Sequence, residues 1–426
     1  MKKSSLGSVS VIGLGYIGLP TAAMFASRQV KVLGVDINKH AVDTINGGRI
    51  HIVEPELDMI VHAAVTEGYL RATTSPEPAE AFLIAVPTPF SDGYKPDLAY
   101  VRAAAESIAP VLTKGNIVIL ESTSPVGTTE QMVEWLAAAR PDLRFPLPGV
   151  TEVDVHVAYC PERVLPGHVV RELVQNDRII GGLTEACSER AAEVYRVFVT
   201  GDLLFSNART AEMSKLTENA FRDVNIAFAN ELSLICSKLD IDVWDLIQLA
   251  NRHPRVNILQ PGAGVGGHCI AVDPWFIVDR TPQEARLTRT AREVNDGKPV
   301  WVMQQIRAAI EARVAAGTPE KSLTVAVLGL AFKPNIDDLR ESPALHIAQQ
   351  LVDATSAKVV LVEPNITQPP RSLASCELLG LEAALERADV IAVLVSHREF
   401  QDLRGQVDPR QAVIDAVGVL AARRPG

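Results

Sequence analysis

Short apolar runs alternate with longer amphipathic stretches over the first part of the chain. The runs occupy residues 8–13, 31–36, 81–86 and 116–120. They are short enough for buried strands, and the stretches between them, the first beginning at about Leu19, have helical spacing. Strands joined by crossover helices are typical of a parallel, doubly wound sheet. We therefore expect a first α/β domain, which the segments 155–160 and 178–182 complete.

The pattern becomes helical from about Thr210 to Leu239, a stretch that contains neither Pro nor Gly. A helix of about 30 residues spans about 45 Å at a rise of 1.5 Å per residue, which is enough to join two domains. Helical character continues through 243–251 and 284–315.

Near residue 320 the alternation of strands and helices starts again. Further strands are predicted at 323–330, 358–363, 390–395 and 412–415. A chain of 426 residues is too long for one ordinary hydrophobic core, so several domains are expected. We place them at residues 1–205, 206–318 and 319–426.

The first predicted strand leads into a glycine loop, Gly13-Leu-Gly15-Tyr-Ile-Gly18, which opens a helix. This context is the one in which such a loop binds a dinucleotide: Gly13 permits the turn, Gly15 lets the backbone approach the pyrophosphate, and Gly18 allows close packing. Asp36 ends the second strand, where a carboxylate accepts a hydrogen bond from a ribose hydroxyl. Because a 2′-phosphate would be repelled there, NAD is favoured over NADP.

The alternative is that the glycines serve only a turn and that Asp36 only ends a strand. Thr88 and Thr123 follow the third and fourth strands, where ligands bind in such sheets, although they could also be ordinary turn residues. The last part of the chain has no second glycine loop of this kind, so it resembles the first domain in architecture rather than in ligand. The expected fold class is α/β, with two doubly wound Rossmann-like domains joined by a long central helix and a helical middle domain.

Composition narrows the class of protein. A net charge of −10 argues against a nucleic-acid binder, and it requires that any anionic substrate be held by locally placed Lys and Arg. Five cysteines without a C-x-x-C pair argue against a disulfide framework or a zinc site and favour a reducing cytoplasm. The first residues lack the apolar run of a signal peptide, and no segment approaches a membrane span, so we expect a soluble chain.

Cys269 lies in a glycine-dense stretch, residues 261–273, that also contains His268 and Asp273. A free cysteine is more often a small buried hydrophobe, and that interpretation holds for Cys160, Cys187, Cys236 and Cys376. The glycines around Cys269 instead admit close approach of a ligand, and a thiolate beside a cation would be nucleophilic.

The predicted long helix supplies a candidate cation. Lys215, Asn219 and Arg222 share one of its faces, which could equally be a solvated stripe. The neighbouring apolar residues, Phe221, Ile226 and Phe228, favour a largely buried helix. His253 and Arg255 add a basic segment that could hold a diphosphate.

Motifs along nearly the whole chain closely resemble the UDP-glucose/GDP-mannose dehydrogenase family. They are the glycine loop, Ile-His-Ile-Val-Glu-Pro (50–55), Cys-Pro-Glu-Arg-Val-Leu-Pro-Gly (160–167), Lys-Leu-Thr-Glu-Asn (215–219), the basic segment 251–262, Gly-Val-Gly-Gly-His-Cys (264–269) and Ala-Phe-Lys-Pro-Asn-Ile-Asp-Asp-Leu-Arg-Glu-Ser-Pro (331–343). The second and third of these point to the branch that acts on N-acetylmannosamine rather than on glucose.

The resemblance implies roles for individual residues. NAD would contact Tyr16, Ile17, Asp36, Thr88, Thr123 and Arg340. The nucleotide sugar would contact Arg163, Val164, Lys215, Asn219, Arg222, His253, Arg255, Gly266 and Lys333. Cys269 would be the nucleophile and Lys215 the general acid/base, while Asp273 would orient the lysine or a water and Glu162 would aid water attack. The resemblance also implies a UDP-binding C-terminal domain and a homodimer joined by the central helix.

The implied activity is a four-electron, NAD-dependent oxidation of a sugar C6 hydroxyl to a uronate through a thiohemiacetal and a thioester on Cys269. The product would serve cell-surface polysaccharide synthesis of the enterobacterial common antigen type. Related substrates, UDP-N-acetylglucosamine or UDP-glucose, remain alternatives. So do a two-electron hydroxyacid dehydrogenase, which would not need Cys269, and a non-enzymatic NAD sensor with Cys269 as a redox switch.

Overall fold

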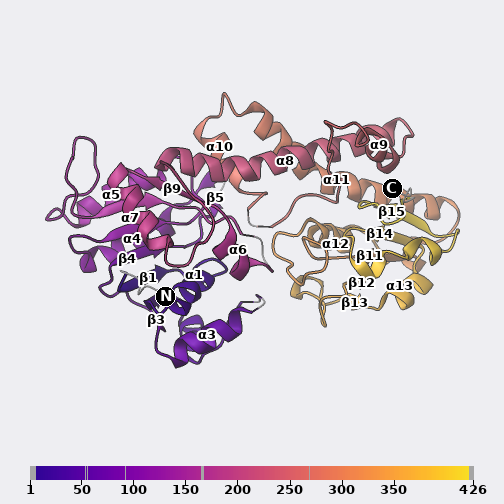
Figure 1. Ribbon diagram of the computed structural model, residues 1–426. Coiled ribbons are helices and arrows are strands. Elements are labelled where there is room, and N and C mark those ends of the chain that lie inside the picture. The colour runs from indigo at the N-terminus through magenta and orange to yellow at the C-terminus, as the bar shows by residue number, and fades with distance from the viewer. Residues whose placement is uncertain are drawn as a thin grey trace. The chain divides into compact units, whose positions relative to one another are not determined.

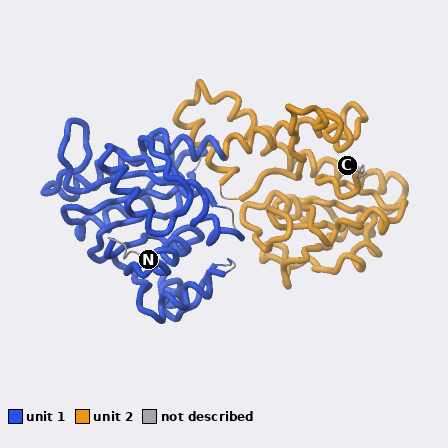
Figure 2. Tube along the Cα trace, viewed as in Figure 1, with its two compact units in different colours: residues 1–218 blue, residues 219–426 orange. Residues whose placement is uncertain are grey.

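The computed structural model of the chain describes residues 6–52, 54, 56–91, 93–164, 167–267 and 269–421. The chain divides into two compact units, residues 1–218 and 219–426 (Figure 2). Among the described residues, no helix combines the length and the apolar character needed to cross a membrane.

Unit 1 is built on an eight-stranded sheet in the order β10-β9-β8-β7-β4-β1-β2-β3. Its strands are β1 (Ser8–Ile12), β2 (Lys31–Val35), β3 (Leu70–Thr73), β4 (Ala81–Ile84), β7 (Ile117–Leu120), β8 (His156–Tyr159), β9 (Arg178–Gly182) and β10 (Leu203–Asn207). The strands predicted from apolar runs are confirmed. Two were missed: β3 is interrupted by a charged residue, and β10 is a half-exposed edge strand.

The order β3-β2-β1-β4-β7-β8, in which neighbouring strands are parallel, is that of a doubly wound dinucleotide-binding sheet. The predicted parallel sheet is confirmed for these strands, but β9 departs from it: it runs antiparallel to β8 and pairs Tyr159 with Gly181. Strand β10 then continues parallel to β9. An apolar run indicates that a strand is buried. It does not indicate the direction of the strand, which depends on the strands with which it pairs.

Helices cover both faces of this sheet. They are α1 (Gly18–Ser27), α2 (Lys39–Asn46), α3 (Leu57–Thr66), α4 (Ala99–Ile108), α5 (Thr128–Ala139), α6 (Val169–Gln175) and α7 (Glu185–Tyr195), and a small hairpin is formed by β5 (Phe90–Ser91) and β6 (Lys95–Pro96). Alternate residues of β4 enter different cores: Leu83 packs with Phe25 of α1, and Phe82 packs on the opposite face with α4 and α5. This is why the strands read as continuous apolar runs.

Unit 2 contains a five-stranded, wholly parallel sheet in the order β13-β12-β11-β14-β15. The strands are β11 (Thr324–Leu328), β12 (Lys358–Val362), β13 (Glu377–Leu378), β14 (Val390–Val393) and β15 (Ala412–Asp415), and the helices associated with them include α12 (Pro343–Ala354) and α13 (Leu381–Arg387). All four predicted strands are present. The short strand β13 was missed because it spans only two residues.

The long predicted helix is α8 (Ala208–Lys238), of 31 residues, and the boundary between the units falls inside it. It is followed by α9 (Val243–Ala250), α10 (Asp273–Arg280) and α11 (Arg286–Ala315). Within unit 2, α8 and α11 run alongside each other (Figure 1) and are joined by a buried polar contact. Arg292 and Asn295 of α11 both donate hydrogen bonds to the Asp223 carboxylate, at 2.6 and 2.8 Å.

Candidate functional site

The glycine loop of unit 1 has the geometry of a dinucleotide-binding turn. Gly13 has a φ of +90°, which is unfavourable for other residues, and a Cβ on Gly18 would overlap the carbonyl oxygen of Gly13. A Cβ on Gly15, by contrast, would meet nothing within 4 Å. Helix α1 begins here without a side-chain cap. The loop therefore leaves open space over Gly15 and an uncapped helix N-terminus, which fits a bound pyrophosphate.

Asp36 is held beside this loop by the backbone. Its Oδ2 accepts a hydrogen bond from the Leu14 N–H and its Oδ1 one from the Asn38 N–H, both at 2.8 Å. The side chain is half-buried. Because each carboxylate oxygen can accept a second hydrogen bond, Asp36 is oriented and still able to accept from a ribose. The residues present fit the predicted cofactor.

The two predicted threonines come together at the carboxyl edge of the unit 1 sheet. Thr88 follows β4 and Thr123 follows the neighbouring strand β7, and the Thr88 hydroxyl donates a hydrogen bond to the Thr123 carbonyl. Both are half-buried. Their placement on the same edge as the glycine loop favours the binding interpretation over that of isolated turn residues.

The segment after β8 carries the predicted residues Glu162, Arg163 and Val164. Glu162 is buried, and its Oε1 accepts a hydrogen bond from the Arg163 N–H at 2.7 Å. The Arg163 side chain forms an ion pair with Glu218 of α8, with 2.7 Å between Nε and Oε1. Val164 packs against the core that contains α1. Lys215, one turn before Glu218, is half-buried.

Glu54, in the motif 50–55, is a residue whose part in this region the sequence did not reveal. Its buried carboxylate accepts hydrogen bonds from the N–H groups of Gly167 and Val169, at 2.9 and 2.8 Å. It therefore ties its own segment to the one that follows Glu162. Five residues of the sequence motifs lie outside the described residues: Val53, Pro55, Leu165, Pro166 and, in the cysteine loop, His268.

Within unit 2, Cys269 is the exposed member of the five cysteines. Burial raises the pKa of Cys160 to about 12 and also raises the pKa of Cys236 and Cys376, so these thiols are poor nucleophiles. The Asp273 N–H donates to the Cys269 carbonyl at 2.8 Å, which fixes one turn of backbone before α10. The Asp273 carboxylate in turn accepts a hydrogen bond from the buried Asn219 side chain.

The cysteine loop also packs on the segment 331–343. A Cβ on Gly266 would overlap the Glu341 carbonyl oxygen, and one on Gly267 would lie 3.1 Å from the Phe332 ring. Glycines are therefore required for this close approach. The packing brings the loop that carries Cys269 against the segment that carries Lys333 and Arg340, which are both exposed.

Tyr16 of the glycine loop is 38% exposed and Ile17 is half-buried, and three further predicted residues are on the surface of unit 2. Arg222 on α8 and His253 and Arg255 after α9 are exposed. The expectation that the apolar residues of α8 bury it is wrong for the single chain: Phe221 is 67% exposed and Phe228 50%. The spacing of these residues could not show whether α8 packs within its own chain or leaves this side uncovered.

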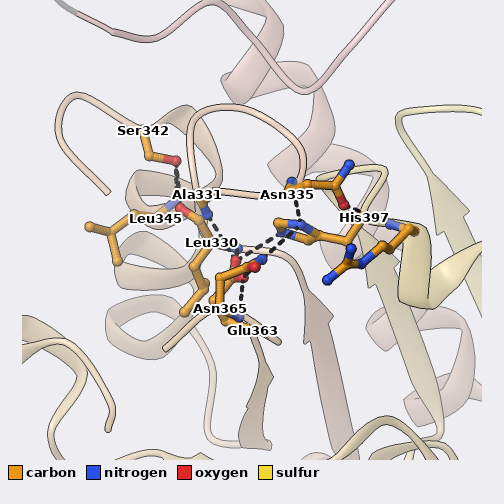
Figure 3. Close-up of polar contacts among 9 residues, drawn as sticks. Leu330, Ala331, Asn335, Ser342, Leu345, Glu363, Asn365 and His397 are labelled. Carbon is orange, nitrogen blue, oxygen red and sulfur yellow. Dashed lines mark hydrogen bonds and ion pairs between the residues drawn. The ribbon is translucent and has the colours of Figure 1, made fainter. Parts of the chain in front are cut away.

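A second carboxylate that the sequence did not reveal holds the segment 331–343 in place (Figure 3). Glu363 follows β12 as Asp36 follows β2, but its side chain is fully buried. Its Oε2 accepts hydrogen bonds from the N–H groups of Leu330 and Ala331, at 2.7 and 3.0 Å, and lies 3.0 Å from His397 Nε2. Its position at the end of a second strand was the signal that could have identified it.

The tautomer of His397 follows from these contacts. Its Nδ1 accepts a hydrogen bond from the Asn335 N–H at 2.9 Å, so Nε2 carries the proton and donates to Glu363. Asn335 has a φ of +62°, a strained value that its contacts to His397 and Arg398 sustain. The buried Glu363–His397 pair therefore holds the segment between Lys333 and Arg340 in place.

A cavity of about 620 Å³ in unit 2 does not belong to this arrangement. Its lining includes Arg313, Asp389 and Arg410, near the amino ends of β14 and β15. It contains none of the predicted site residues. Ligands of doubly wound sheets bind at the opposite, carboxyl edge.

Comparisons with known proteins agree with this geometry. Three models of the UDP-glucose/GDP-mannose dehydrogenase family match: the NAD binding domain at residues 7–199, the central domain at 209–297 and the UDP binding domain at 326–422. The UDP-N-acetyl-D-mannosamine dehydrogenase of Salmonella typhi is 63% identical over 97% of this chain and 99% of its own. The NDP-N-acetyl-D-galactosaminuronic acid dehydrogenase of Ralstonia nicotianae is 62% identical over 98% and 97%.

Solved structures extend the likeness to the fold. A UDP-D-ManNAc dehydrogenase from Pyrococcus horikoshii is 38% identical, with a TM-score of 0.84, over 98% of this chain and 96% of that one. The UDP-N-acetyl-mannosamine dehydrogenase from Staphylococcus aureus is 41% identical, with the same TM-score and coverage.

Gly15→Ala and Gly18→Ala form a matched pair that separates cofactor binding from packing. Because a methyl group at position 15 would project into open space, we expect Gly15→Ala to weaken NAD binding about tenfold or more, or ~1.4 kcal/mol, without changing thermal unfolding of the free protein. Gly18→Ala should instead lower the unfolding midpoint by about 5 °C because it overlaps Gly13. Calorimetric titration and thermal scans measure both. Unchanged NAD affinity in Gly15→Ala would contradict the assigned loop geometry.

Glu363→Gln tests the buried anchor of unit 2. Burial works to raise the pKa of Glu363, but the hydrogen bonds from His397 and Leu330 outweigh it and lower the pKa to about 2. A lowered pKa contributes stability that is complete above the unfolded-state value of 4.5 and is lost as the pH falls toward 2. The variant should therefore lose up to ~3 kcal/mol of unfolding free energy at pH 7 and less at pH 4.

Urea unfolding of wild type and variant at pH 7, 5 and 4, followed by tryptophan fluorescence, measures this difference. Glu377→Gln is the control, because Glu377 also pairs with basic side chains but is exposed, so its loss should change stability little. A pH-independent gap between wild type and Glu363→Gln would show that the Glu363 charge is not what stabilises unit 2.

Proposed function

Because the chain belongs to the UDP-glucose/GDP-mannose dehydrogenase family, we propose that it oxidises the C6 hydroxyl of UDP-N-acetyl-D-mannosamine to the carboxylate. The reaction removes four electrons and uses two molecules of NAD. The observation that carries the proposal is the setting of Cys269, an exposed thiol in a glycine loop beside the Asp273–Asn219 pair. The 63% identity to a dehydrogenase of that sugar supports the choice of substrate.

Gly15 and Asp36 would hold NAD at its pyrophosphate and its ribose, and the bound cofactor would supply the hydride acceptor for each half of the reaction. The other proposed cofactor contacts are the glycines at 13, 15 and 18, together with Tyr16, Ile17, Thr88, Thr123 and Arg340.

In the first half, Lys215 accepts the proton of the C6 hydroxyl, directly or through water. The Cys269 thiolate then adds to the resulting aldehyde and holds it as a thiohemiacetal, which cannot diffuse away. Lys215 and Asn219 donate hydrogen bonds to the oxyanion, and the loss of one such donor typically costs about 3 kcal/mol of barrier. Asp273 orients Asn219 through the hydrogen bond that they share.

In the second half, oxidation of the thiohemiacetal leaves a thioester on Cys269. Water adds to its carbonyl, the carbon–sulfur bond breaks, and Cys269 leaves as a thiolate. Glu162 takes a proton from the attacking water. The proposed substrate contacts are Arg163, Val164, Lys215, Asn219, Arg222, His253, Arg255, Gly266 and Lys333.

A second candidate is the corresponding oxidation of a UDP-N-acetyl-D-galactosamine-type sugar. It is favoured by the 62% identity to the NDP-N-acetyl-D-galactosaminuronic acid dehydrogenase, which is nearly as similar to this chain. The glucose-type substrates, the two-electron dehydrogenase and the NAD sensor predict other outcomes of the same assay. Three further expectations stay predictions: a place in cell-surface polysaccharide synthesis, a cytoplasmic location, and domain limits at 205/206 and 318/319.

We also propose a homodimer that uses one side of α8. Phe221, Phe228, Ile235 and Leu239 are 67%, 50%, 45% and 61% exposed in the single chain. The seven-residue spacing of Phe221, Phe228 and Ile235 places these three on one face of α8, and Leu239 follows directly after the last residue of the helix. Exposed apolar side chains gathered in this way mark an association surface, and a second copy can cover them with the same stripe.

Assaying NADH and acid release from a panel of UDP-sugars tests the activity. We expect two NADH per UDP-N-acetyl-D-mannosamine consumed, and the highest kcat/KM for that sugar. Cys269→Ser should lose acid formation while retaining some single oxidation, because its hydroxyl is a far weaker nucleophile than a thiolate. Cys376→Ser, a change at a half-buried cysteine, is the control and should retain both steps. Undiminished acid output from Cys269→Ser would refute the covalent route.

Phe228→Glu tests the proposed dimer. A charge in the middle of the apolar stripe would have to be buried on association, so we expect sedimentation to show a monomer. Ser237→Glu is the matched control, since Ser237 is exposed on the opposite side of α8 and should leave the oligomeric state unchanged. A wild-type chain that sediments as a monomer at micromolar concentration would rule the dimer out.

A further inference from the structure

Unit 1 contains a buried charged cluster that the proposed mechanism uses only in part. It consists of Glu121, Glu162, Arg178 and Tyr195, and we refer to it as the Arg178 cluster. The Arg178 side chain is 4% exposed, that of Glu121 0% and that of Glu162 6%. Burial of three ionisable groups is costly unless they are paired, and breaking such a pair leaves a buried charge without compensation.

The sheet topology explains how these residues meet. Glu121 follows β7 and Glu162 follows β8, so both lie at the carboxyl edge of the sheet. Arg178 begins β9, which runs antiparallel to β8 with Tyr159 opposite Gly181. The start of β9 therefore extends past the end of β8, toward Glu162. In a parallel β9 the same residue would lie at the opposite edge.

The contacts place Arg178 between the two carboxylates. Its Nη2 donates a hydrogen bond to Glu162 Oε2, and its Nη1 lies 3.3 Å from Glu121 Oε1. The Tyr195 hydroxyl donates to the same Glu121 oxygen at 2.6 Å. The guanidinium carbon lies 4.2 Å from the centre of the Tyr195 ring, which is within cation–π range. Arg178 is thus held by Glu121 and Tyr195 on one side and by Glu162 on the other.

We propose that Arg178 is a positioning residue that fixes the Glu162 carboxylate for water activation, and that Glu121 and Tyr195 determine how much of the Arg178 charge Glu162 receives. The inference rests on the proposed function, in which Glu162 takes a proton from the attacking water. Arg178 acts through Glu162 and not on the substrate.

Glu121 is the member of the cluster whose charge changes near neutral pH. Burial raises its pKa to about 7, against the opposing influence of Arg178, and its Oε2 has no hydrogen-bond partner among the described residues. The other titratable groups facing it are Cys160 and Tyr195. Burial raises the pKa of the Cys160 thiol to about 12 and that of the Tyr195 hydroxyl well above its usual value, so both stay neutral.

Ionisation of Glu121 is expected to accelerate thioester hydrolysis. When Glu121 is protonated, Arg178 is paired with Glu162 alone. When Glu121 ionises, it competes with Glu162 for Arg178, so Arg178 withholds the Glu162 carboxylate less from the proton of the attacking water. Thioester hydrolysis should therefore accelerate as the pH rises through about 7, beyond what the other groups of the site contribute.

Single-turnover measurements on the full chain with UDP-N-acetyl-D-mannosamine and NAD can isolate this step. Rapid quenching gives the rates of NADH formation and of acid release, and intact-protein mass gives the amount of adduct on Cys269. For Arg178→Lys we expect an unchanged first oxidation, acid release slowed about tenfold or more, and accumulated thioester. Arg171→Lys, at an arginine of α6 bonded to Gln175, is the control and should match wild type. Equal slowing of both phases in Arg178→Lys would overturn the positioning role.

Glu121→Gln provides the second arm and does not depend on Arg178→Lys folding. A glutamine oxygen can still accept from Tyr195 and Arg178, but it cannot ionise. The ratio of wild-type to variant hydrolysis rates should rise through pH 7, while the same ratio for the first oxidation stays flat. A flat hydrolysis ratio would overturn the inference. If wild type releases one NADH and no acid, the proposed function fails instead.

Discussion

A carboxylate removed from water must be given hydrogen-bond donors, and both units are organised around this requirement at the carboxyl edges of their sheets. In unit 1, backbone N–H groups hold Asp36, and Arg178 is paired with both Glu121 and Glu162. In unit 2, backbone N–H groups and His397 hold Glu363. Arg178 begins β9, but the donors to Asp36 and Glu363 come from loops that follow strands. Satisfying these two carboxylates therefore also fixes the loops that carry parts of the candidate site.

The two sheets use the same topological position differently. Asp36 follows β2, which pairs with β1, and Glu363 follows β12, which pairs with β11; β1 and β11 are the first strands of their sheets in chain order. Each carboxylate accepts hydrogen bonds from the loop after that first strand. Asp36 remains half-buried and able to accept from a ligand. Glu363 is fully buried, with its oxygens used by the protein, so it anchors the segment of Lys333 and Arg340 instead. One architecture therefore yields a cofactor site in one unit and a structural support in the other.

Sequence reasoning identified the candidate site because its signals are local. Three glycines in a strand-loop-helix context identified the cofactor turn, and the glycine-dense loop singled out Cys269 from four cysteines that are buried or half-buried. It did not point to Arg178 or His397, since neither lies in a motif of its own. Their importance arises from Glu162 and Glu363, which lie 16 and 34 positions away in the chain.

By itself, the sequence determined the alternation of strands and helices and the cofactor, and it singled out one thiol, because periodicity and spacing act over a few residues. Tertiary structure alone decided the reversed direction of β9, the pairing of Arg178 with two carboxylates and the exposure of Phe221 and Phe228 on α8. Strand direction, charge pairing and burial depend on which distant segments meet, and a local pattern contains no information about that.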